Sequence, residues 1–373
     1  MPDGSNATSD LVPMDVAGRL GRLRERFDVA GVDALIVTAI SNVRYLTGFT
    51  GSAGLVVVTT DRAALVTDGR YAGQAPSQLA AAGSDIDVEV SSDAQDGLVS
   101  QIVGGSARVG LEADSIVWSA QQRYERLFDG RQLVATRGVV ESLRIRKDAG
   151  EVDRMARAAA IADAALAEVR AMLLDRPSEA EFALALDTAI RRHGASGNSF
   201  ETIVASGPNG ALPHARPTER TIADGDLVVL DFGAVVDGYC SDMTRTVAIG
   251  DLSDTQARMA ECVTAAQRAG VAAVRSGATS RDVDRACRDV IDDYGWSERF
   301  THGTGHGVGL DIHEAPRVSS ASDATLEAGF VVTVEPGVYI DPHGGVRVED
   351  TVVVTDTGCT VLTKSPKSLS VVG

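Results

Sequence analysis

Hydrophobic positions in the first part of the chain alternate between strand-like and helix-like patterns. Residues 16–29 carry apolar side chains at helical spacing. Five short runs rich in β-forming residues predict strands, at residues 34–38, 55–60, 63–67, 86–90 and 107–111. The second and third of these runs are separated by Asp61-Arg62, which favours a hairpin. This alternation predicts a compact α/β domain.

The rest of the chain is first helical and then rich in glycine. Four helices are predicted, at residues 151–174, 179–192, 255–274 and 280–293. Pro177-Ser178 is a typical start for the second of these helices. Charged residues gather just before the first helix, so we place a domain boundary near residue 145. We therefore expect a flexible tail over residues 1–14, an α/β domain over residues 15–145 and an α+β domain over residues 146–373.

Charge and cysteine content narrow the class of protein. The chain has 35 basic and 52 acidic side chains and a net charge of −17, so we expect neither nucleic acid nor an anionic membrane as a partner. No apolar run approaches the roughly 18 residues of a membrane span, and the N-terminus lacks the blocks of a secretion signal. The four cysteines lie far apart, which is typical of free thiols in a reducing compartment. We therefore expect a cytoplasmic protein.

The first candidate for chemistry is a predicted hairpin with two aspartates. Asp237-Gly238 is a strong signal for a tight turn between two β-prone flanks. Asp231 and Asp242 lie on either side of this turn, so we expect their carboxylates nearly opposite each other on neighbouring strands. Cross-strand neighbours lie within about 8 Å of each other. That separation allows both carboxylates to bind one divalent cation.

A second predicted hairpin repeats this arrangement with glutamates. Residues 331–335 read as a strand, residues 341–345 as a turn and residues 346–349 as the returning strand. Glu335 and Glu349 lie symmetrically about that turn. Four carboxylates in one pocket would repel one another and raise several pKa values. The pattern therefore predicts a bound metal.

A glycine-rich segment, residues 301–314, supplies imidazoles. Its histidines recur at steps of four and seven residues, at His302, His306 and His313. The intervening glycines let the backbone approach a site closely. The segment is not a dinucleotide-binding loop, because Val308 stands where the third glycine would be. It is not a zinc-protease helix either, because Pro316 would break the helix.

The combination of these donors predicts a class of metal and of reaction. Aspartate, glutamate and histidine without cysteine favour hard or borderline cations such as Mn²⁺, Zn²⁺ or Co²⁺. Four carboxylates exceed what one catalytic zinc uses, so a two-metal site about 3.5–4 Å across is the better interpretation. Such a pair of ions activates water and polarises a carbonyl. The sequence therefore predicts metal-assisted hydrolysis.

Together these segments resemble the metallopeptidases of the pita-bread fold, which include aminopeptidase P, prolidase, creatinase and methionine aminopeptidase. The resemblance is carried, in the family's order and spacing, by Asp231, Asp242, the His306 segment, Glu335-Pro-Gly337 and residues 344–349 (GGVRVE). Residues 42–51 (NVRYLTGFTG) look like the creatinase-type N-terminal domain, which methionine aminopeptidases lack. The resemblance implies a creatinase-like α/β domain followed by an α+β pita-bread domain, in the branch of the Xaa-Pro peptidases.

The resemblance also implies which residues bind the metal. Asp231 would bind one ion, and Asp242 and Glu349 would bridge both ions. His306 and Glu335 would complete the coordination of the other ion. Glu335 would in addition act as the general base toward the attacking water. The metals expected are two divalent ions, Mn²⁺ first, with Co²⁺ and Zn²⁺ as alternatives.

Further residues match the family around this centre. His302 and His313 would contact the substrate and stabilise the tetrahedral intermediate. His214, in the segment SGPNGALPH, matches another active-site histidine of the family. Arg347, two residues before a predicted ligand and so on the same face of a strand, would position the neighbouring carboxylates. Arg317 could bind a substrate carboxylate or form a structural ion pair.

The activity implied by the resemblance is hydrolysis of the bond between an N-terminal residue and proline in small peptides. Aminopeptidase P takes Xaa-Pro-Yaa peptides, whereas prolidase takes only Xaa-Pro dipeptides. The compact form of the chain favours aminopeptidase P, and prolidase is the alternative. A creatinase-like hydrolase of another C–N bond and a non-catalytic binding module on the same fold are further alternatives. Family analogy also implies a homodimer.

Overall fold

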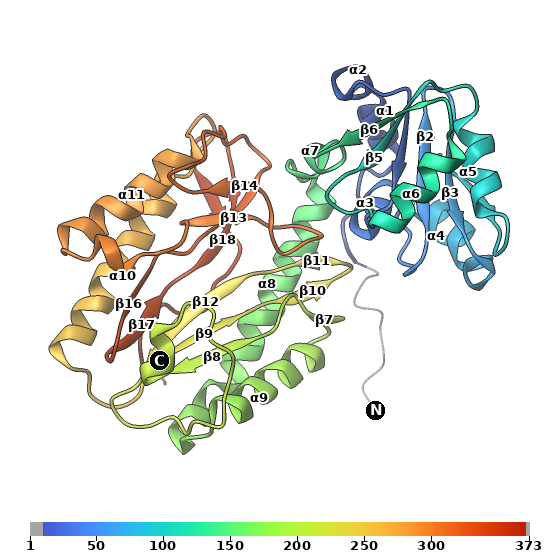
Figure 1. The fold of residues 1–373 in the computed structure, drawn as a ribbon. Helices are drawn as coiled ribbons and strands as arrows, with labels where there is room; N and C mark the ends of the chain where they lie inside the picture. The colour runs from blue at the N-terminus through green and yellow to red at the C-terminus, as the bar shows by residue number, and fades with distance from the viewer. Residues whose placement is uncertain (1–9, 371–373) are drawn as a thin grey trace. The chain divides into compact units, whose positions relative to one another are not determined.

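The computed structural model describes residues 10–370, which form two compact units (Figure 1). Residues 14–144 form one unit, and residues 145–370 form the other together with residues 10–13. Most of the predicted tail, residues 1–9, lies outside the described residues. In the remainder, the Val12 N–H donates to the Asp153 carboxylate, and the Val12 carbonyl accepts from Arg154 at 2.8 Å. This end of the predicted tail is therefore anchored.

A six-stranded mixed sheet forms the centre of the N-terminal unit, in the order β4-β3-β2-β1-β5-β6. Its strands are β1 (Ala34–Val37), β2 (Leu55–Thr59), β3 (Ala63–Thr67), β4 (Asp87–Val90), β5 (Arg108–Glu112) and β6 (Gln132–Thr136). The β1–β2 and β2–β3 pairs are antiparallel, and the other neighbours are parallel. All residues of β1 are buried, as its unbroken apolar run predicts.

Short helices connect these strands. They are α1 (Ala17–Arg24), α2 (Phe27–Ala30), α3 (Ile40–Thr47), α4 (Gln74–Ala82), α5 (Gln95–Val103), α6 (Trp118–Leu127), α7 (Glu141–Arg144) and the 3₁₀ turn η1 (Gly69–Tyr71). The single helix predicted over residues 16–29 is divided into α1 and α2. Gly31 ends α2 in the left-handed conformation, with a φ of 68°, which a glycine adopts without strain. The predicted α/β domain is otherwise observed.

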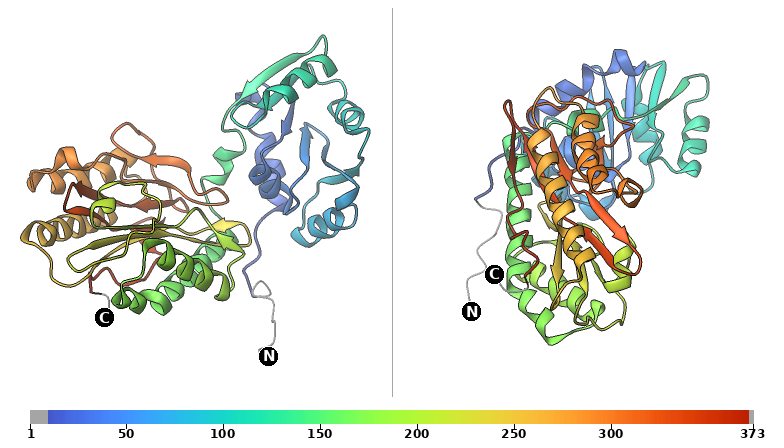
Figure 2. Two further views of the ribbon diagram at one scale, coloured as in Figure 1. Left: turned by 60° about the horizontal axis from the view of Figure 1, so that its bottom comes forward. Right: turned by 90° about the vertical axis from the view of Figure 1, so that its left-hand side faces the viewer.

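In the C-terminal unit, strands lie between two pairs of helices (Figures 1 and 2). The helices are α8 (Ala149–Val169), α9 (Glu179–Arg192), α10 (Asp254–Ala273) and α11 (Ser280–Asp293), with the 3₁₀ turns η2 (Arg170–Asp175), η3 (Gly207–Ala211) and η4 (Ser297–Arg299). Each of the four helices starts with a capping box, at Asp148, Ser178, Ser253 and Thr279. The helix start predicted at Pro177-Ser178 is thus confirmed.

The strands of this unit form several small sheets. Those of the first half are β7 (Gly197–Asn198), β8 (Ile203–Ser206), β9 (Leu227–Phe232), β10 (Ala234–Val236), β11 (Tyr239–Cys240) and β12 (Met243–Ala248). Those of the second half are β13 (Gly305–Gly307), β14 (Glu314–Val318), β15 (Val331–Val334), β16 (Gly337–Ile340), β17 (Gly344–Arg347), β18 (Asp350–Val354) and β19 (Cys359–Val361). One hydrophobic core lies between α8–α9 and the first set, and another between α10–α11 and the second.

The second predicted hairpin differs from the expectation at its tip. Gly344 and Gly345 were predicted in the turn but lie in β17, which pairs with β16. The first strand is also interrupted after β15, at Pro336. A proline has no N–H to donate to a β-ladder, which explains the interruption. In residues 10–370 no helix has both the length and the apolar character that a membrane span requires.

Candidate metal centre

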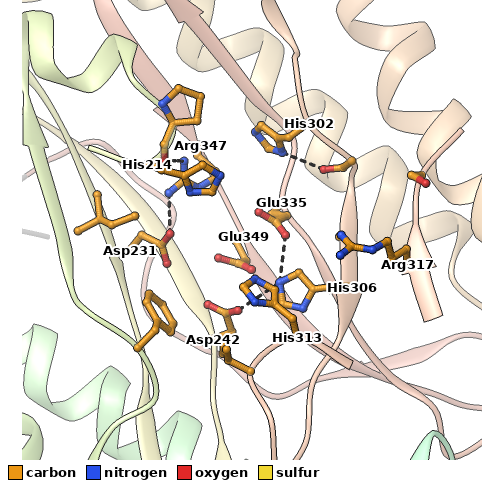
Figure 3. A pocket seen from close by; sticks show the side chains of 17 residues that line it. His214, Asp231, Asp242, His302, His306, His313, Arg317, Glu335, Arg347 and Glu349 are labelled. Carbon is orange, nitrogen blue, oxygen red and sulfur yellow. Dashed lines mark hydrogen bonds and ion pairs between the residues drawn. The ribbon is translucent and has the colours of Figure 1, made fainter. Parts of the chain in front are cut away.

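The first pair of acids comes from β9 and from the residue before β12. Asp237 and Gly238 form the predicted tight turn with φ values of 43° and 78°, the pattern of a type I′ hairpin. Asp231 pairs with Thr244 on β12, two residues beyond Asp242. The two aspartates are therefore diagonal cross-strand neighbours, and their side chains enter one cavity (Figure 3).

The second pair of acids faces across the interruption between β15 and β16. Val334 pairs with Asp350 in one ladder, and Gly337 pairs with Arg347 in the other. In both ladders the two residue numbers of every pair add up to the same value. The β16–β17 ladder therefore continues the register of the β15–β18 ladder. Glu335 therefore lies opposite Glu349, as the symmetry about the turn predicted.

His306 reaches the acids from β13, which passes unusually close to its neighbours. A side chain at Gly305 would place its Cβ 2.1 Å from the Thr333 carbonyl oxygen, so only glycine fits there. The Nδ1 atom of His306 lies 2.9 Å from the Gly307 carbonyl oxygen and must carry a proton. The Nε2 atom therefore carries the lone pair that can bind a metal. It lies 3.5 Å from a carboxylate oxygen of Asp242 and 3.4 Å from one of Glu335.

These side chains form a cluster that can hold a cation. One oxygen or nitrogen atom from each of Asp242, His306 and Glu349 lies within 4.8 Å of the others. The Oδ1 atom of Asp231 is buried and has no hydrogen-bond partner among residues 10–370. A buried carboxylate oxygen without a donor is rare, and a cation would satisfy it. The residues present therefore fit a divalent metal bound by oxygen and imidazole nitrogen.

The electrostatics of the cluster agree with this assignment. Burial raises the pKa of Glu335 to about 8. Burial and the neighbouring carboxylates also raise the pKa values of Asp242 and Glu349 well above their usual range. Burial lowers the pKa of His306 to about 4, so its ring is neutral. The predicted repulsion among the acids is thus present, and a positive ion would relieve it.

Arg347 connects this cluster to the pocket wall. Its Nη2 donates to Asp231 at 2.6 Å, and its Nε donates to the Thr244 hydroxyl at 3.1 Å. Thr244 in turn donates to Glu349 at 2.7 Å. Arg347 also donates to the Tyr339 hydroxyl oxygen at 2.8 Å. The arginine therefore contacts Asp231 directly and Glu349 through Thr244.

Comparison with known proteins identifies the family of this arrangement. Residues 153–356 match metallopeptidase family M24, and residues 19–146 match the creatinase/prolidase N-terminal domain. The chain belongs to metallopeptidase family M24. The predicted creatinase-like domain followed by an α+β metallopeptidase domain is thereby confirmed, and so is the resemblance to the Xaa-Pro peptidases.

Individual M24 relatives are similar over nearly their whole length. An uncharacterized peptidase of Bacillus subtilis, YqhT, is 42% identical over 94% of this chain and 99% of its own. The Xaa-Pro dipeptidase of Pyrococcus furiosus is 33% identical over the same shares. Among solved structures, the Xaa-Pro dipeptidase from Bacillus anthracis has a TM-score of 0.91 and 41% identity, covering 95% of this chain and 99% of that one. The X-Pro aminopeptidase from Thermotoga maritima has a TM-score of 0.84 and 32% identity, over 94% and 99%.

The two glycine-loop histidines of this M24 chain differ in their surroundings. The Nδ1 of His302 lies 2.8 Å from the Gly303 carbonyl oxygen, and its Nε2 lies 2.9 Å from the Tyr339 hydroxyl. Burial and the charge of Arg347 lower the pKa of His302 to about 4. A neutral ring with its proton on Nδ1 accepts from the tyrosine at Nε2, so both ring nitrogens are engaged. His306 keeps one nitrogen free.

The mouth of the M24 pocket carries three exposed groups, His214, His313 and Arg317. The His313 ring packs against His306 at 4.4 Å between centroids, and burial with the charge of Arg317 lowers its pKa. Within residues 10–370, neither the His214 ring nor the Arg317 guanidinium has a hydrogen bond or ion pair. The structural ion pair considered for Arg317 is therefore not observed.

Some residues in the pocket or directly behind its lining were not found from the sequence. Tyr339 lies four residues after Glu335 and so on the same face of the hairpin, which is a signal that could have revealed it. The cavity of about 340 Å³ is also lined by apolar side chains, Phe200, Ile203, Pro213 and Ile312. No pattern in the sequence distinguishes these from ordinary core residues. They provide a hydrophobic wall beside the polar cluster.

Proposed function

We propose that this M24 metallopeptidase hydrolyses the bond between an N-terminal residue and proline in small peptides. Relatives named Xaa-Pro dipeptidase and Xaa-Pro aminopeptidase support this substrate class. The observation that carries the proposal is the cluster of Asp242, His306 and Glu349, beside the Oδ1 of Asp231, which has no hydrogen-bond partner in the described part of the chain. An apolar wall next to that cluster suits a proline ring.

We propose two divalent ions at this cluster. Asp231 would hold one ion, Asp242 and Glu349 would contact both, and His306 and Glu335 would hold the other. Mn²⁺ is the first candidate for this donor set, with Co²⁺ and Zn²⁺ as alternatives. When bound, such ions supply a Lewis acid for the scissile carbonyl and lower the pKa of water.

The protein's own side chains perform the proton transfers and the orientation. Glu335 accepts the proton of the attacking water, a role supported by the family resemblance and by its place in the cluster, 3.4 Å from Nε2 of His306. His313 and His214 offer ring nitrogens at the mouth to the oxygen that becomes negative in the tetrahedral intermediate. His302, predicted to contact the substrate, lines the same cavity with both ring nitrogens engaged, so its contribution is a shaped wall. Arg347 keeps Asp231 and, through Thr244, Glu349 in place.

One observation favours a second specificity, that of an Xaa-Pro dipeptidase. The Arg317 guanidinium lies at the pocket mouth without a partner among residues 10–370. A dipeptide presents a free carboxylate directly after the proline ring, and arginine binds carboxylates in a bidentate manner. An Xaa-Pro-Yaa peptide has no charge at that point. Arg317 therefore supports the dipeptidase over the aminopeptidase.

A peptide panel separates these specificities. Activity on Gly-Pro and on Gly-Pro-Yaa tripeptides is compared for the parent and for Arg317→Ala, after removal of metal and return of Mn²⁺, Co²⁺ or Zn²⁺. A dipeptidase loses about 10²-fold in kcat/KM on Gly-Pro with the alanine variant, because a charge-assisted bond is lost. Equal cleavage of tripeptides by both proteins would instead identify an aminopeptidase. Failure on all proline peptides with every metal would reject the proposal and favour a creatinase-like hydrolase or a binding module.

Two further properties belong to the same proposal. We propose a homodimer, supported by family analogy alone, and sedimentation of the purified protein tests it. We also propose a cytoplasmic location, supported by the wide spacing of the four cysteines along the chain, without any Cys-x-x-Cys pair. Cell fractionation tests that location, and recovery of the protein in a secreted fraction would reject it.

A further inference from the structure

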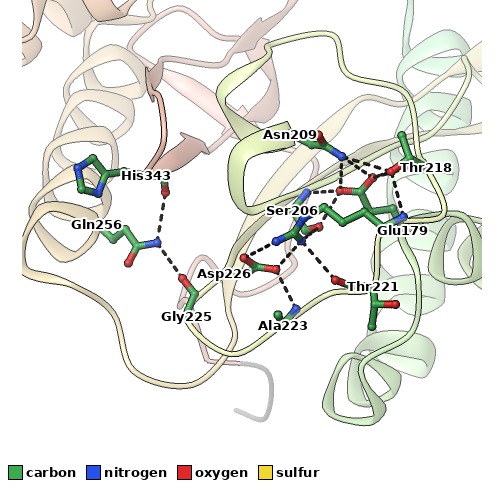
Figure 4. A network of polar contacts seen from close by, with 11 residues as sticks. Glu179, Ser206, Asn209, Thr218, Thr221, Ala223, Gly225, Asp226, Gln256 and His343 are labelled. Atoms are coloured by element: carbon green, nitrogen blue, oxygen red, sulfur yellow. Dashed lines mark hydrogen bonds and ion pairs between the residues drawn. The ribbon is translucent and has the colours of Figure 1, made fainter.

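A loop outside the metal cluster is tied at both ends to one buried carboxylate (Figure 4). Glu179, the first residue of α9, is completely buried. Its Oε1 accepts from the Ser206 N–H and the Ser206 hydroxyl, both at 2.7 Å. Its Oε2 accepts from the Thr218 N–H at 3.0 Å and the Thr218 hydroxyl at 2.6 Å. The amide of Asn209 donates to both oxygens.

These contacts enclose the segment that carries His214. Ser206 ends β8, and Thr218 lies four residues after His214. Between them, η3 packs backbone to backbone against β17, since a Cβ at Gly345 would lie 2.0 Å from the Gly210 carbonyl oxygen. The loop over residues 207–221 is therefore fixed by Glu179 at Ser206 and Thr218, on either side of His214, and by β17 along one side.

The middle of this loop reaches the pocket. The Pro213 carbonyl accepts from Nη1 of Arg347 at 3.1 Å, and the other nitrogen of that guanidinium holds Asp231. Pro213 and His214 both line the cavity. A displacement of the loop would thus move the His214 ring and remove one acceptor from Arg347.

The start of α9 does not need Glu179 for its own capping. Ser178 and Glu181 already form a complete capping box there. The Ser206 hydroxyl also accepts from Arg220, which is paired with Asp226, so its hydrogen is directed to Glu179. The carboxylate of Glu179 therefore binds the loop, whereas the carboxylate of the nearby Glu181 caps the helix.

We propose that Glu179 is a positioning residue for peptide hydrolysis, which acts through the loop over residues 207–221 on His214 and on the Pro213 carbonyl. This inference rests on the proposed function, because it assigns His214 to the reaction. It predicts that Glu179 and His214 are energetically coupled although their side chains do not touch. A buried carboxylate that only stabilised the fold would show no such coupling.

The test is a double-mutant cycle of Glu179→Gln and His214→Ala on Gly-Pro hydrolysis. The glutamine keeps the shape of the side chain but turns one oxygen into a donor that faces other donors. We expect kcat/KM to fall on the order of 10- to 100-fold in E179Q, since misplacement of a catalytic group is that costly. In the H214A background the same change should cost less than about 3-fold.

A second readout follows the loop without activity. Amide hydrogen exchange over residues 207–221 should accelerate in E179Q, because one of the two amides that tie the loop, that of Ser206 or that of Thr218, loses its acceptor. Bound metal, measured by elemental analysis, should be unchanged, because the loop supplies none of the proposed ligands. Glu181→Gln is the matched control, since it removes an equal charge from the same helix end and keeps the capping acceptor. It should change neither exchange nor kcat/KM.

Several outcomes would overturn the inference. If the losses of kcat/KM in E179Q and H214A multiply in the double variant, the two residues are not coupled. Glu179 would then stabilise the fold without positioning His214. Unchanged exchange over the loop in E179Q would have the same meaning. If E179Q fails to fold, Thr218→Val removes the hydroxyl from the loop side alone and should show the same coupling to His214. An inactive parent would reject the proposed function, while the exchange experiment would still decide whether Glu179 holds the loop.

Discussion

The two histidine-bearing loops of the pocket are held in different ways. The loop with His214 is fixed from outside by Glu179, and its imidazole is exposed. The segment with His302 is fixed by Asp284, which accepts from the Thr304 N–H at 3.2 Å and its hydroxyl at 2.8 Å. Arg288, paired with Asp284, donates to the His302 carbonyl at 2.6 Å. In the second loop the ring itself is also fixed, by Gly303 and Tyr339.

The histidines of these two loops therefore differ in what they can do. A ring with both nitrogens engaged and a pKa near 4 cannot exchange protons with a substrate near neutral pH. A ring with free nitrogens at the mouth can donate to a substrate oxygen. We therefore expect His302 to support the pocket and His214 to be available for the reaction.

The largest effect is expected from a substitution in the proposed metal site itself. His306→Ala removes the one imidazole among the proposed ligands, so activity should fall on the order of 10³-fold or more. Bound metal should fall as well, whereas the far-ultraviolet circular dichroism should stay that of the parent. Full activity with a normal metal content in H306A would contradict the assignment.

Replacing each loop histidine by alanine tests whether His214 and His302 have different roles. His214→Ala should lower kcat/KM by on the order of 10²-fold and change stability by less than about 0.5 kcal/mol, since the ring is exposed. His302→Ala should destabilise the fold by about 1–3 kcal/mol, because the Tyr339 hydroxyl loses its acceptor in a buried site. Urea denaturation and steady-state kinetics measure both quantities. Equal stability losses in the two variants would remove the distinction.

A smaller effect is expected from Tyr339→Phe. The change removes the donor to Nε2 of His302 and one acceptor of Arg347, but it leaves the ring in place. We expect a loss of about 1 kcal/mol in stability. Activity should fall less than in H214A, because Arg347 keeps its bond to Asp231. A loss as large as that of H306A would mean that the hydroxyl contacts the substrate.

The last effect concerns stability alone, as a function of pH in metal-free protein. A carboxyl with a raised folded pKa binds its proton more tightly when folded, so stability is lost as pH rises toward about 8 for Glu335. His302 and His306, with folded pKa values near 4, add stability as pH rises, but only up to their unfolded pKa of about 6.5. Between pH 6.5 and 8, only the acidic groups with raised pKa values still change the stability. The urea midpoint in a chelator should therefore fall over that window.

Controls make this last measurement specific. Glu335→Gln should reduce the fall, and added Mn²⁺ should abolish it, because a cation stabilises the ionised carboxylates. A rise in the urea midpoint over the same window in chelated protein would contradict the raised pKa values.

The parts of this protein that could be predicted from sequence are those set by local rules. The α9 start follows from Pro177-Ser178, and the hairpin turn follows from Asp237-Gly238, whose positive φ values suit that pair. The acid pairs could be predicted because a hairpin register follows from its turn. The division of the helix over residues 16–29 needed the tertiary structure, whereas the strand break at Pro336 has a local cause that our prediction overlooked.

The remaining site residues depend on long-range contacts. Glu179 meets Thr218 across 39 positions of the chain, and nothing near either residue signals that contact. The apolar wall of Phe200 and Ile312 consists of ordinary hydrophobic residues, so its role depends on which segments the fold brings together. Arg317 could be noticed in the sequence, but its lack of an ion pair within residues 10–370 required the structure.

The shared register of the two ladders around Glu335 and Glu349 constrains how the gene can lengthen or shorten. Extra codons at the tip, residues 341–343, would enlarge the connection and leave the two acids face to face. A single codon inserted between Glu335 and Gly337 would instead reverse the sides to which the following side chains point, and Tyr339 would turn away from His302 and Arg347. The separation of the two acids along the chain is therefore free to vary, but only at one place.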